Sequence, residues 1–233
     1  MRTGGVSVGP HASLNLGRGV GDSPEAVREN HERLAGAAGV RGEFATAHQV
    51  HGDRVVAAGG KEIFASTEPQ PHEGADAVVA LETGAAAGVR VADCVPVLLY
   101  AEEERVAAAV HSGWRGARLS IAGRGVRALQ HAAGADPKRI LAAIGPCIGR
   151  CCYEVSPDLA QAFRGLFGPD VADDAVKPHL DLRLCVERAL LAAGVPQERI
   201  EQVPGCTSCD IGAFFSHRRD KGVTGRHLAF IVA

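Results

Sequence analysis

Aromatic side chains are scarce in this chain, with one Trp, two Tyr and seven Phe among 233 residues. Hydrophobic residues nevertheless make up 46%, so a sizeable core must be built mainly from Ala, Val and Leu. No apolar run reaches the roughly 18 residues that a membrane-spanning helix needs. The formal net charge is only −2. This balance gives no indication of a nucleic-acid or membrane partner, so we expect neither.

The segment MRTGGVSVGPH at the start lacks the apolar stretch of a secretory signal. Seven cysteines are present, an odd number. Without a secretory signal we expect reduced thiols and a cytoplasmic location. As a separate expectation, we take the chain to be a monomer. Most free cysteines are small buried hydrophobes, and a few act as metal ligands or nucleophiles.

The chain shows no internal repeat, low-complexity segment or long linker, which predicts a single domain over residues 1–233. A capped helix is expected from Ser23 as N-cap, through Pro24 in the first turn, to Gly39 at the C-terminal stop. Further helices are expected near 114–133 and 181–193. The polar segment 61–74 is typical of a surface loop.

Strand-like runs occur at 43–50, 53–57, 75–81, 95–100, 105–111, 139–145 and 227–232. Strands and helices do not alternate regularly along the chain, so a doubly wound fold is not favoured. The pattern predicts an α+β fold, with a mixed β-sheet sandwich flanked by helices in one compact domain.

VPVLLYA (95–101) and RVAAAVH (105–111) flank three glutamates and predict a β-hairpin with an acidic turn. Paired residue numbers in an antiparallel hairpin sum to a constant. A turn centred on residues 102 and 103 therefore places Cys94 beside His111. AHQVHGD (47–53) offers a third ligand, either His48 or His51, and spacing does not choose between them. Two imidazoles and one thiolate would suit zinc and leave a fourth position open, as a catalytic site requires.

The same residues have simpler explanations, because a lone Cys is usually buried in the core and a lone His at a strand end is usually hydrogen-bonded. Gly113 and Gly116 would let the chain turn tightly from this strand into a helix. Arg115 then becomes a candidate anion ligand, or alternatively a partner in a structural salt bridge. Trp114 is expected to serve packing. Asp93 could orient a ligand or move a proton.

CTSC (206–209) has the C-x-x-C spacing of zinc sites, but the sequence has no second pair of this kind. Cys147, Cys151 and Cys152 could complete a site only through tertiary proximity, and GPCIGRCCYEV (145–155) is more simply a turn between a strand and a helix. The loop FFSHRRDKGVTGR (214–226) brings Arg218, Arg219 and Lys221 together. These cations could collect an anionic group or remain solvated.

Taken together, these motifs resemble the bacterial polyphenol-oxidase or laccase-domain family, also called YfiH-like, whose members are generally regarded as purine nucleoside phosphorylases. The resemblance spans nearly the whole chain. It rests on GGVS, SLNLG, QVHG (49–52), GADAVV (74–79), ADCVPVLL (92–99), HSGWRG (111–116), GPCIGRCCYEV, CT (206–207) and FFSHRRDKGVTGR.

The resemblance implies that His51, Cys94 and His111 form a catalytic, metal-binding trio, and so favours His51 over His48. It implies Zn²⁺ as cofactor, with Cu²⁺ as a second possibility. It also implies phosphorolysis of adenosine, inosine, guanosine and methylthioadenosine-type nucleosides with inorganic phosphate, together with adenosine deamination. Substrate-binding roles then fall to four residues, Asp93, Arg115, Arg218 and Arg219.

Three alternatives remain open at this point. A copper polyphenol oxidase would need many more histidines, including H-x-H clusters, and the chain has none. A cysteine or metal hydrolase, such as an amidase that edits peptidoglycan precursors, could use Cys94 as nucleophile and His111 as base. A non-enzymatic protein could hold a metal for stability or buffering.

Overall fold

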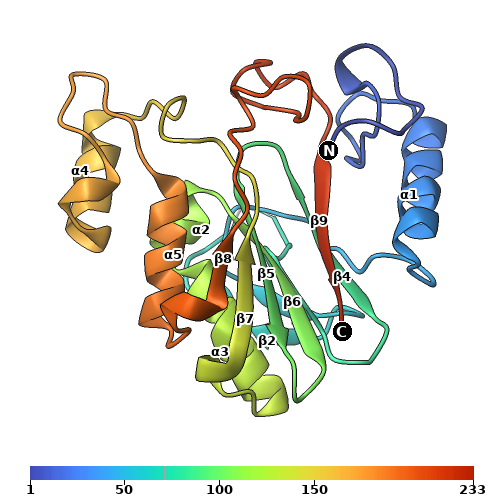
Figure 1. Cartoon of the computed structure of the whole chain (residues 1–233), viewed down its shortest axis with the longest axis horizontal. Helices are drawn as coiled ribbons and strands as arrows, with labels where there is room; N and C mark the ends of the chain where they lie inside the picture. Colours follow the sequence, from blue (N-terminus) through green and yellow to red (C-terminus); the bar gives the residue numbers. More distant parts are fainter. Residues whose placement is uncertain (71) are drawn as a thin grey trace.

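The computed structural model describes residues 1–70 and 72–233, and its largest element is a seven-stranded mixed sheet (Figure 1). The strand order is β2 (Glu62–Phe64), β1 (Val55–Ala57), β3 (Ala77–Ala80), β6 (Val106–Ser112), β5 (Val95–Ala101), β7 (Ile140–Ile144) and β8 (Ile200–Gln202). Each of the central strands β3, β6, β5 and β7 runs antiparallel to its neighbour in this order, while β1 and β8 pair in parallel with β3 and β7.

A two-stranded ribbon of β4 (Ala86–Val91) and β9 (His227–Val232) packs against one face of this sheet. The other face is covered by α2 (Trp114–Arg118), α3 (Ile121–Ala133) and α5 (Leu182–Ala192). Strand β3 buries side chains on both faces of the sheet, so both faces must be covered. Ala77 and Val79 belong to the core on the helix side, whereas Val78 and Ala80 belong to the core on the ribbon side. The expected α+β architecture with a mixed sheet between layers is confirmed.

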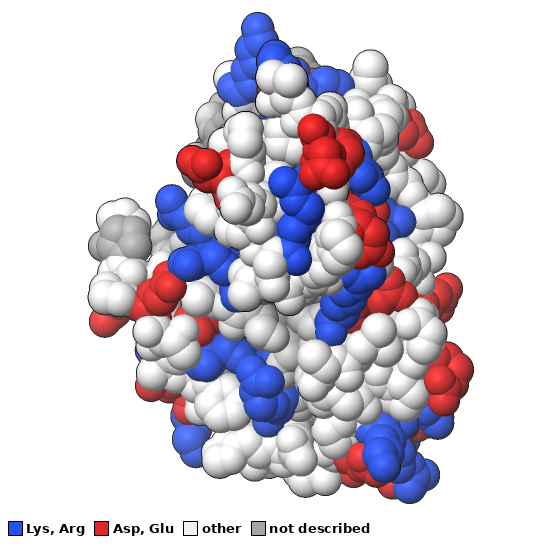
Figure 2. Space-filling view, turned by 90° about the vertical axis from the view of Figure 1, so that its left-hand side faces the viewer, with Lys and Arg blue, Asp and Glu red and all other residues white. Residues whose placement is uncertain are grey.

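Two helices lie at opposite sides of the molecule, α1 (Pro24–Ala38) and α4 (Pro157–Phe167) (Figure 1). Short 3₁₀ helices span Gly9–His11, Pro137–Arg139, Pro169–Val171 and Gln197–Arg199. None of the described helices is long and apolar enough to cross a membrane. On the side of the molecule shown in Figure 2, Lys and Arg residues are interspersed with Asp and Glu residues, without a broad area of one sign.

The first predicted helix is confirmed in detail. The Ser23 hydroxyl accepts a hydrogen bond from the Ala26 N–H, and Gly39 closes the helix in the left-handed conformation at φ 67°. The helix predicted over 114–133 is interrupted, because Ser120 adopts φ 56° and separates α2 from α3. The helix predicted over 181–193 is α5, which Asp181 caps.

The hairpin prediction is right in kind and wrong in register. β5 and β6 pair Pro96 with His111, because the turn has four residues (102–105) where two were expected, and it is centred between Glu103 and Glu104. The predicted strand over 43–50 is absent apart from an isolated bridge at Ala45. The predicted loop over 61–74 contains β2, and the sequence patterns did not indicate β4, α4 or β8.

Candidate metal centre and substrate cavity

Three segments deliver the candidate ligands to one end of the sheet. His51 lies in the loop before β1, Cys94 directly precedes β5, and His111 lies near the end of β6. One ligand atom from each side chain lies within 4.8 Å of the other two. The structure therefore brings together the three residues that the resemblance implied, and their role as metal ligands stays a prediction.

Asp76 holds this arrangement in place, and the sequence patterns did not single it out. The His111 Nδ1 lies 2.7 Å from Asp76 Oδ1, which leaves Nε2 as the ring nitrogen available to a metal. The same buried carboxylate accepts hydrogen bonds from the backbone N–H groups of Val50, His51 and Gly52, at 3.2, 3.0 and 2.7 Å. One carboxylate thus orients one imidazole and the loop carrying the other.

The Cys94 thiol and the His111 imidazole shift each other's protonation. Burial raises the pKa of Cys94, but the charge of His111 and hydrogen bonds from both imidazoles outweigh it, so the pKa of Cys94 falls below its ordinary value. Burial lowers the pKa of His111, but Cys94 and Asp76 outweigh it and raise that pKa. A thiolate beside an imidazolium is therefore favoured, and a thiolate is the form that binds metals.

At Gly113 the backbone lies so close to the side chains of His51 and Cys94 that there is no room for a larger residue. A Cβ atom at this position would lie 2.9 Å from an imidazole carbon of His51 and 3.1 Å from Cys94 Sγ. Trp114 next to it is half-buried and packs against the helix-side core, as expected. The glycine is needed because the chain passes directly over the candidate ligands.

Asp93, immediately before Cys94, connects three loops and adopts φ 92°. Its carboxylate accepts hydrogen bonds from the Thr207 hydroxyl at 2.6 Å and from the Arg218 backbone N–H at 2.6 Å. Its carbonyl accepts a third from the Ile148 N–H at 2.9 Å. Since both carboxylate oxygens are engaged, the arrangement favours a positioning role for Asp93 over a role in proton transfer.

A cavity of about 420 Å³ opens beside the three candidate ligands. This volume lies within the range of roughly 300–1,000 Å³ that small-molecule sites occupy. Four arginines line it, namely Arg18, Arg90, Arg218 and Arg226. Asp93 supplies the only carboxylate among its lining residues in the described part of the chain. The cavity therefore favours an anionic ligand.

Two of these arginines are half-buried and donate to uncharged oxygens, so no neighbouring carboxylate neutralises them through those contacts. Arg90 donates to the Thr46 hydroxyl at 3.2 Å and to a backbone carbonyl at 3.1 Å. Arg226 donates to two backbone carbonyls, at 2.9 and 3.0 Å. Burial lowers the pKa of Arg226, while Cys94 and Asp93 act in the opposite direction, which places Arg226 within electrostatic reach of both.

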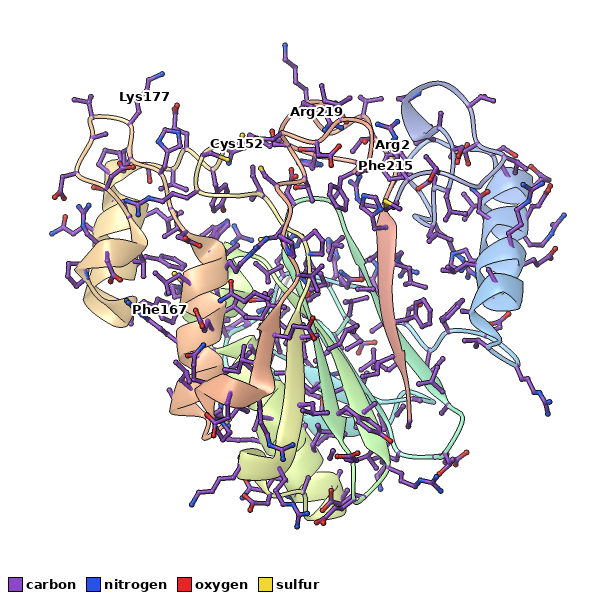
Figure 3. All side chains as sticks on the ribbon, viewed as in Figure 1. Arg2, Cys152, Phe167, Lys177, Phe215 and Arg219 are labelled. Atoms are coloured by element: carbon purple, nitrogen blue, oxygen red, sulfur yellow. The ribbon has the colours of Figure 1, made fainter. Side chains whose placement is uncertain are left out.

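The structure does not bring two predicted substrate ligands into this cavity. Arg115 is exposed, stacks on Trp114 with 5.1 Å from its guanidinium carbon to the ring centroid, and lies outside the cavity lining. Its helix, α2, has only five residues and offers little dipole. Arg219, labelled in Figure 3, lies in the loop before β9. It pairs with the neighbouring carboxylate of Asp220 and donates to the carbonyl of Thr207. Arg218 does line the cavity, with its guanidinium over Tyr153.

The fold and the site define a class of α+β proteins with a candidate His–Cys–His metal site beside a cationic small-molecule cavity. A family model described as multi-copper polyphenol oxidoreductase laccase matches residues 1–233, and the chain belongs to that family. The earlier resemblance is thereby confirmed.

Curated relatives carry phosphorylase names. The chain is 38% identical to the purine nucleoside phosphorylase YlmD of Geobacillus stearothermophilus, over 98% of this chain and 86% of the relative. It is 35% identical to the purine nucleoside phosphorylase YfiH of Escherichia coli, over 99% and 90%. The crystal structure of the Geobacillus YlmD superposes with a TM-score of 0.88 at 36% identity, covering 99% of this chain and 88% of that one.

Proposed function

We propose that this chain is a zinc-dependent purine nucleoside phosphorylase, acting on adenosine, inosine, guanosine and methylthioadenosine-type nucleosides. The observation that carries the proposal is the convergence of His51, Cys94 and His111 beside a cavity lined by arginines. The names of the relatives support the same reaction class.

The residues present fit a zinc ion. Two imidazoles and a thiolate are donors that zinc accepts, and three protein ligands leave a fourth position for catalysis. Asp76 fixes the His111 ring with Nε2 available, which is the usual arrangement of a carboxylate behind a metal-binding histidine. When bound, zinc would supply a Lewis acid that stabilises developing negative charge.

The arginines that line the cavity would bind the second substrate, inorganic phosphate. Arg226 lines the cavity and is influenced by the charge of Cys94, and Arg90 adds a second half-buried guanidinium. A phosphate oxygen bonds to the anomeric carbon while the glycosidic bond breaks. The electron pair of that bond leaves with the purine, which gains a proton. Arginines that hold the phosphate oppose its charge and orient the attack.

Adenosine deamination at the same site is part of the proposal. The same cavity and candidate ligands would serve attack by phosphate on the anomeric carbon or attack by water on the purine carbon that carries the amino group, with ammonia leaving. A second candidate function is hydrolysis through Cys94, including amide editing of a peptidoglycan precursor. It is favoured by the lowered pKa of Cys94 beside His111, an arrangement that activates a thiol nucleophile. A multi-copper oxidase is not favoured, because only one group of potential metal ligands in the described residues contains histidine.

The decisive assay gives purified protein of measured metal content adenosine with and without phosphate. Adenine and ribose 1-phosphate, formed only with phosphate, support phosphorolysis. Inosine without cleavage of the glycosidic bond supports deamination alone. Absence of any nucleoside product, together with hydrolysis of an amide bond in a peptidoglycan precursor to an amine and a carboxylate, refutes the proposal in favour of hydrolysis.

A matched pair of variants tests the phosphate site. Arg226→Gln removes a cavity charge, whereas Arg115→Gln removes an exposed charge outside the cavity. Hydrogen bonds to charged groups contribute about 1.5–3 kcal/mol, which corresponds to roughly a 10- to 100-fold change in binding. We expect the KM for phosphate to rise by about that factor in Arg226→Gln and to stay unchanged in Arg115→Gln. The reverse result would restore Arg115 as the phosphate ligand.

A further inference from the structure

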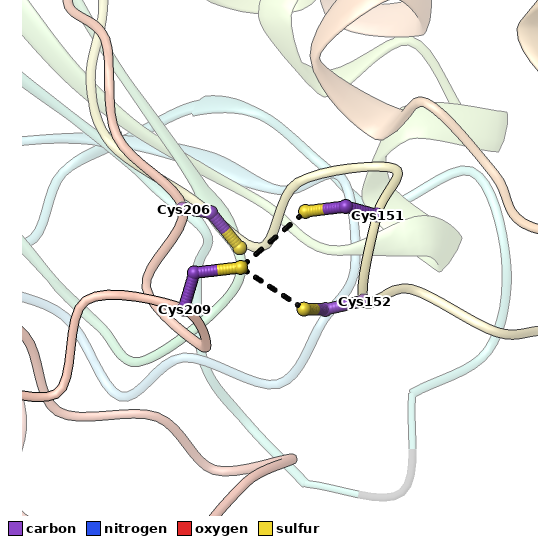
Figure 4. A group of neighbouring side chains, drawn as sticks. All are labelled: Cys151, Cys152, Cys206 and Cys209. Carbon is purple, nitrogen blue, oxygen red and sulfur yellow. Dashed lines mark hydrogen bonds between the residues drawn. The ribbon is translucent and has the colours of Figure 1, made fainter.

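Four cysteines from two distant segments meet outside the cavity described above (Figure 4). Cys151 and Cys152 follow β7, and Cys206 and Cys209 lie between β8 and β9. One sulfur from each lies within 4.8 Å of the other three. The Cys209 sulfur is 3.5 Å from that of Cys151 and 3.4 Å from that of Cys152. We propose that these four thiols form a structural zinc site.

The spacing of the sulfurs suits tetrahedral coordination. Zinc–sulfur bonds of about 2.3 Å in a tetrahedron place neighbouring sulfurs roughly 3.8 Å apart. The Cys209–Cys151 and Cys209–Cys152 sulfur separations need to open by a few tenths of an ångström, and every other separation within the cluster is at most 4.8 Å. Cys151 and Cys209 are exposed, and rotation of their side chains about χ1 can supply movements of this size.

The backbone around the cluster is already arranged for it. Cys147 and Cys206 form a β-bridge, and the Thr207 N–H donates to the Cys147 carbonyl at 3.0 Å, so the two segments are joined beside the thiols. The Gly149 N–H donates to Cys206 Sγ at 3.1 Å, an interaction that favours a thiolate acceptor.

Position 149 lies against two of the four sulfurs and has little room for a side chain. A Cβ atom there would lie 3.2 Å from Cys151 Sγ and 3.3 Å from Cys206 Sγ. Any other residue would therefore crowd two of the four thiols. C-x-x-C spacing at 206–209 supplies two ligands from one turn, and the adjacent pair Cys151–Cys152 supplies the partners that the sequence pattern lacked.

Four protein ligands close the coordination sphere, so this site stabilises structure instead of activating substrate. None of the four cysteines lines the cavity, but the segment that carries Cys151 and Cys152 forms part of its wall. Tyr153, next to Cys152, lines the cavity, and Thr207, next to Cys206, donates to Asp93. A bound zinc would therefore fix two loops that position the residue preceding Cys94.

The test uses Cys94→Ser protein, which lacks one candidate ligand of the other site, so the two metal sites are read separately. We expect Cys94→Ser to retain one zinc per chain after purification under reducing conditions. Adding Cys209→Ser should reduce this to none, while adding Ser208→Ala, in the same turn, should leave one. Metal content is measured by elemental analysis, and chelation of the remaining zinc should lower the thermal midpoint.

Cobalt substitution provides a readout that does not depend on a cysteine variant of the cluster. Apo Cys94→Ser protein titrated anaerobically with Co²⁺ should develop thiolate-to-cobalt charge-transfer bands and the strong visible absorption of tetrahedral four-sulfur ligation. A spectrum of octahedral Co²⁺ without charge transfer would overturn the proposal. So would metal-free protein whose mass shows a disulfide among the four cysteines. Neither outcome depends on whether the chain cleaves nucleosides.

Discussion

Replacing Asp76 by Asn tests the link between fold and candidate metal centre most directly. The side chain keeps its size, but one carboxylate oxygen becomes an NH₂ donor. Oδ2 accepts from the N–H groups of Val50 and Gly52, and Oδ1 accepts from the His51 N–H and contacts His111 Nδ1. Whichever oxygen is replaced, at least one backbone N–H group loses its acceptor.

The expected magnitudes follow from these contacts. If the amide nitrogen takes the Oδ2 position, two backbone donors are orphaned, at about 1–3 kcal/mol each. If it takes the Oδ1 position, it donates to His111 Nδ1, and the ring carries its proton on Nε2, where it blocks metal binding. We therefore expect the free energy of unfolding to fall by roughly 2–6 kcal/mol in the first case. In either case zinc affinity should fall about 10- to 100-fold.

The assay combines zinc titration against a chromophoric chelator with urea unfolding. Asp53→Asn is the matched control, because Asp53 is also fully buried and accepts from Ser66 and Thr67 without contacting either imidazole. This control should lose stability and keep its zinc affinity in the folded protein. Unchanged zinc affinity in Asp76→Asn would refute the reasoning that this carboxylate orients the site.

Two further predictions concern Gly113 and His227. Gly113→Ala should lower zinc affinity and activity at least about 10-fold, because its Cβ would lie 3.1 Å from Cys94 Sγ, whereas Gly165→Ala, which meets open space, should change neither in the same titration and assay. Burial lowers the pKa of His227 to about 3, and its Nε2 accepts from the Phe215 N–H, so the folded state holds the neutral ring. Its contribution to stability is therefore complete above about pH 6.5 and is lost as the pH falls toward 3. His227→Gln should flatten this decline in unfolding curves measured between pH 7 and 4, and an unchanged slope would contradict it.

Local patterns predicted much of the framework. Ser23, Pro24 and Gly39 mark the ends of α1 because capping depends on hydrogen bonds within a few residues. The hairpin of β5 and β6 was predicted because two apolar runs flank a short acidic turn. The register of this hairpin was predicted wrongly, because the turn has four residues and Arg105 within it adopts φ 54°. The composition of the turn does not indicate this conformation.

The proximity of Cys94 and His111 nevertheless survives this error. With the observed register continued by one position, Cys94 faces Gly113, and the His111 side chain, two residues earlier on the strand, lies close enough for a ligand atom of each to fall within 4.8 Å. The prediction depended on the end of the hairpin at which both residues lie, and that end does not change when the turn lengthens by two residues.

By itself, the sequence determined the amphipathic helices, the buried strands and the kinds of side chain available as ligands, because periodicity and capping act over short stretches of chain. Only the tertiary structure decided that Asp76 supports His111, that Arg90 and Arg226 face the cavity while Arg115 does not, and that the cysteine pairs meet. These contacts join residues far apart along the chain. Their partners are fixed by the order of strands in the sheet and the paths of the loops, which no local pattern specifies.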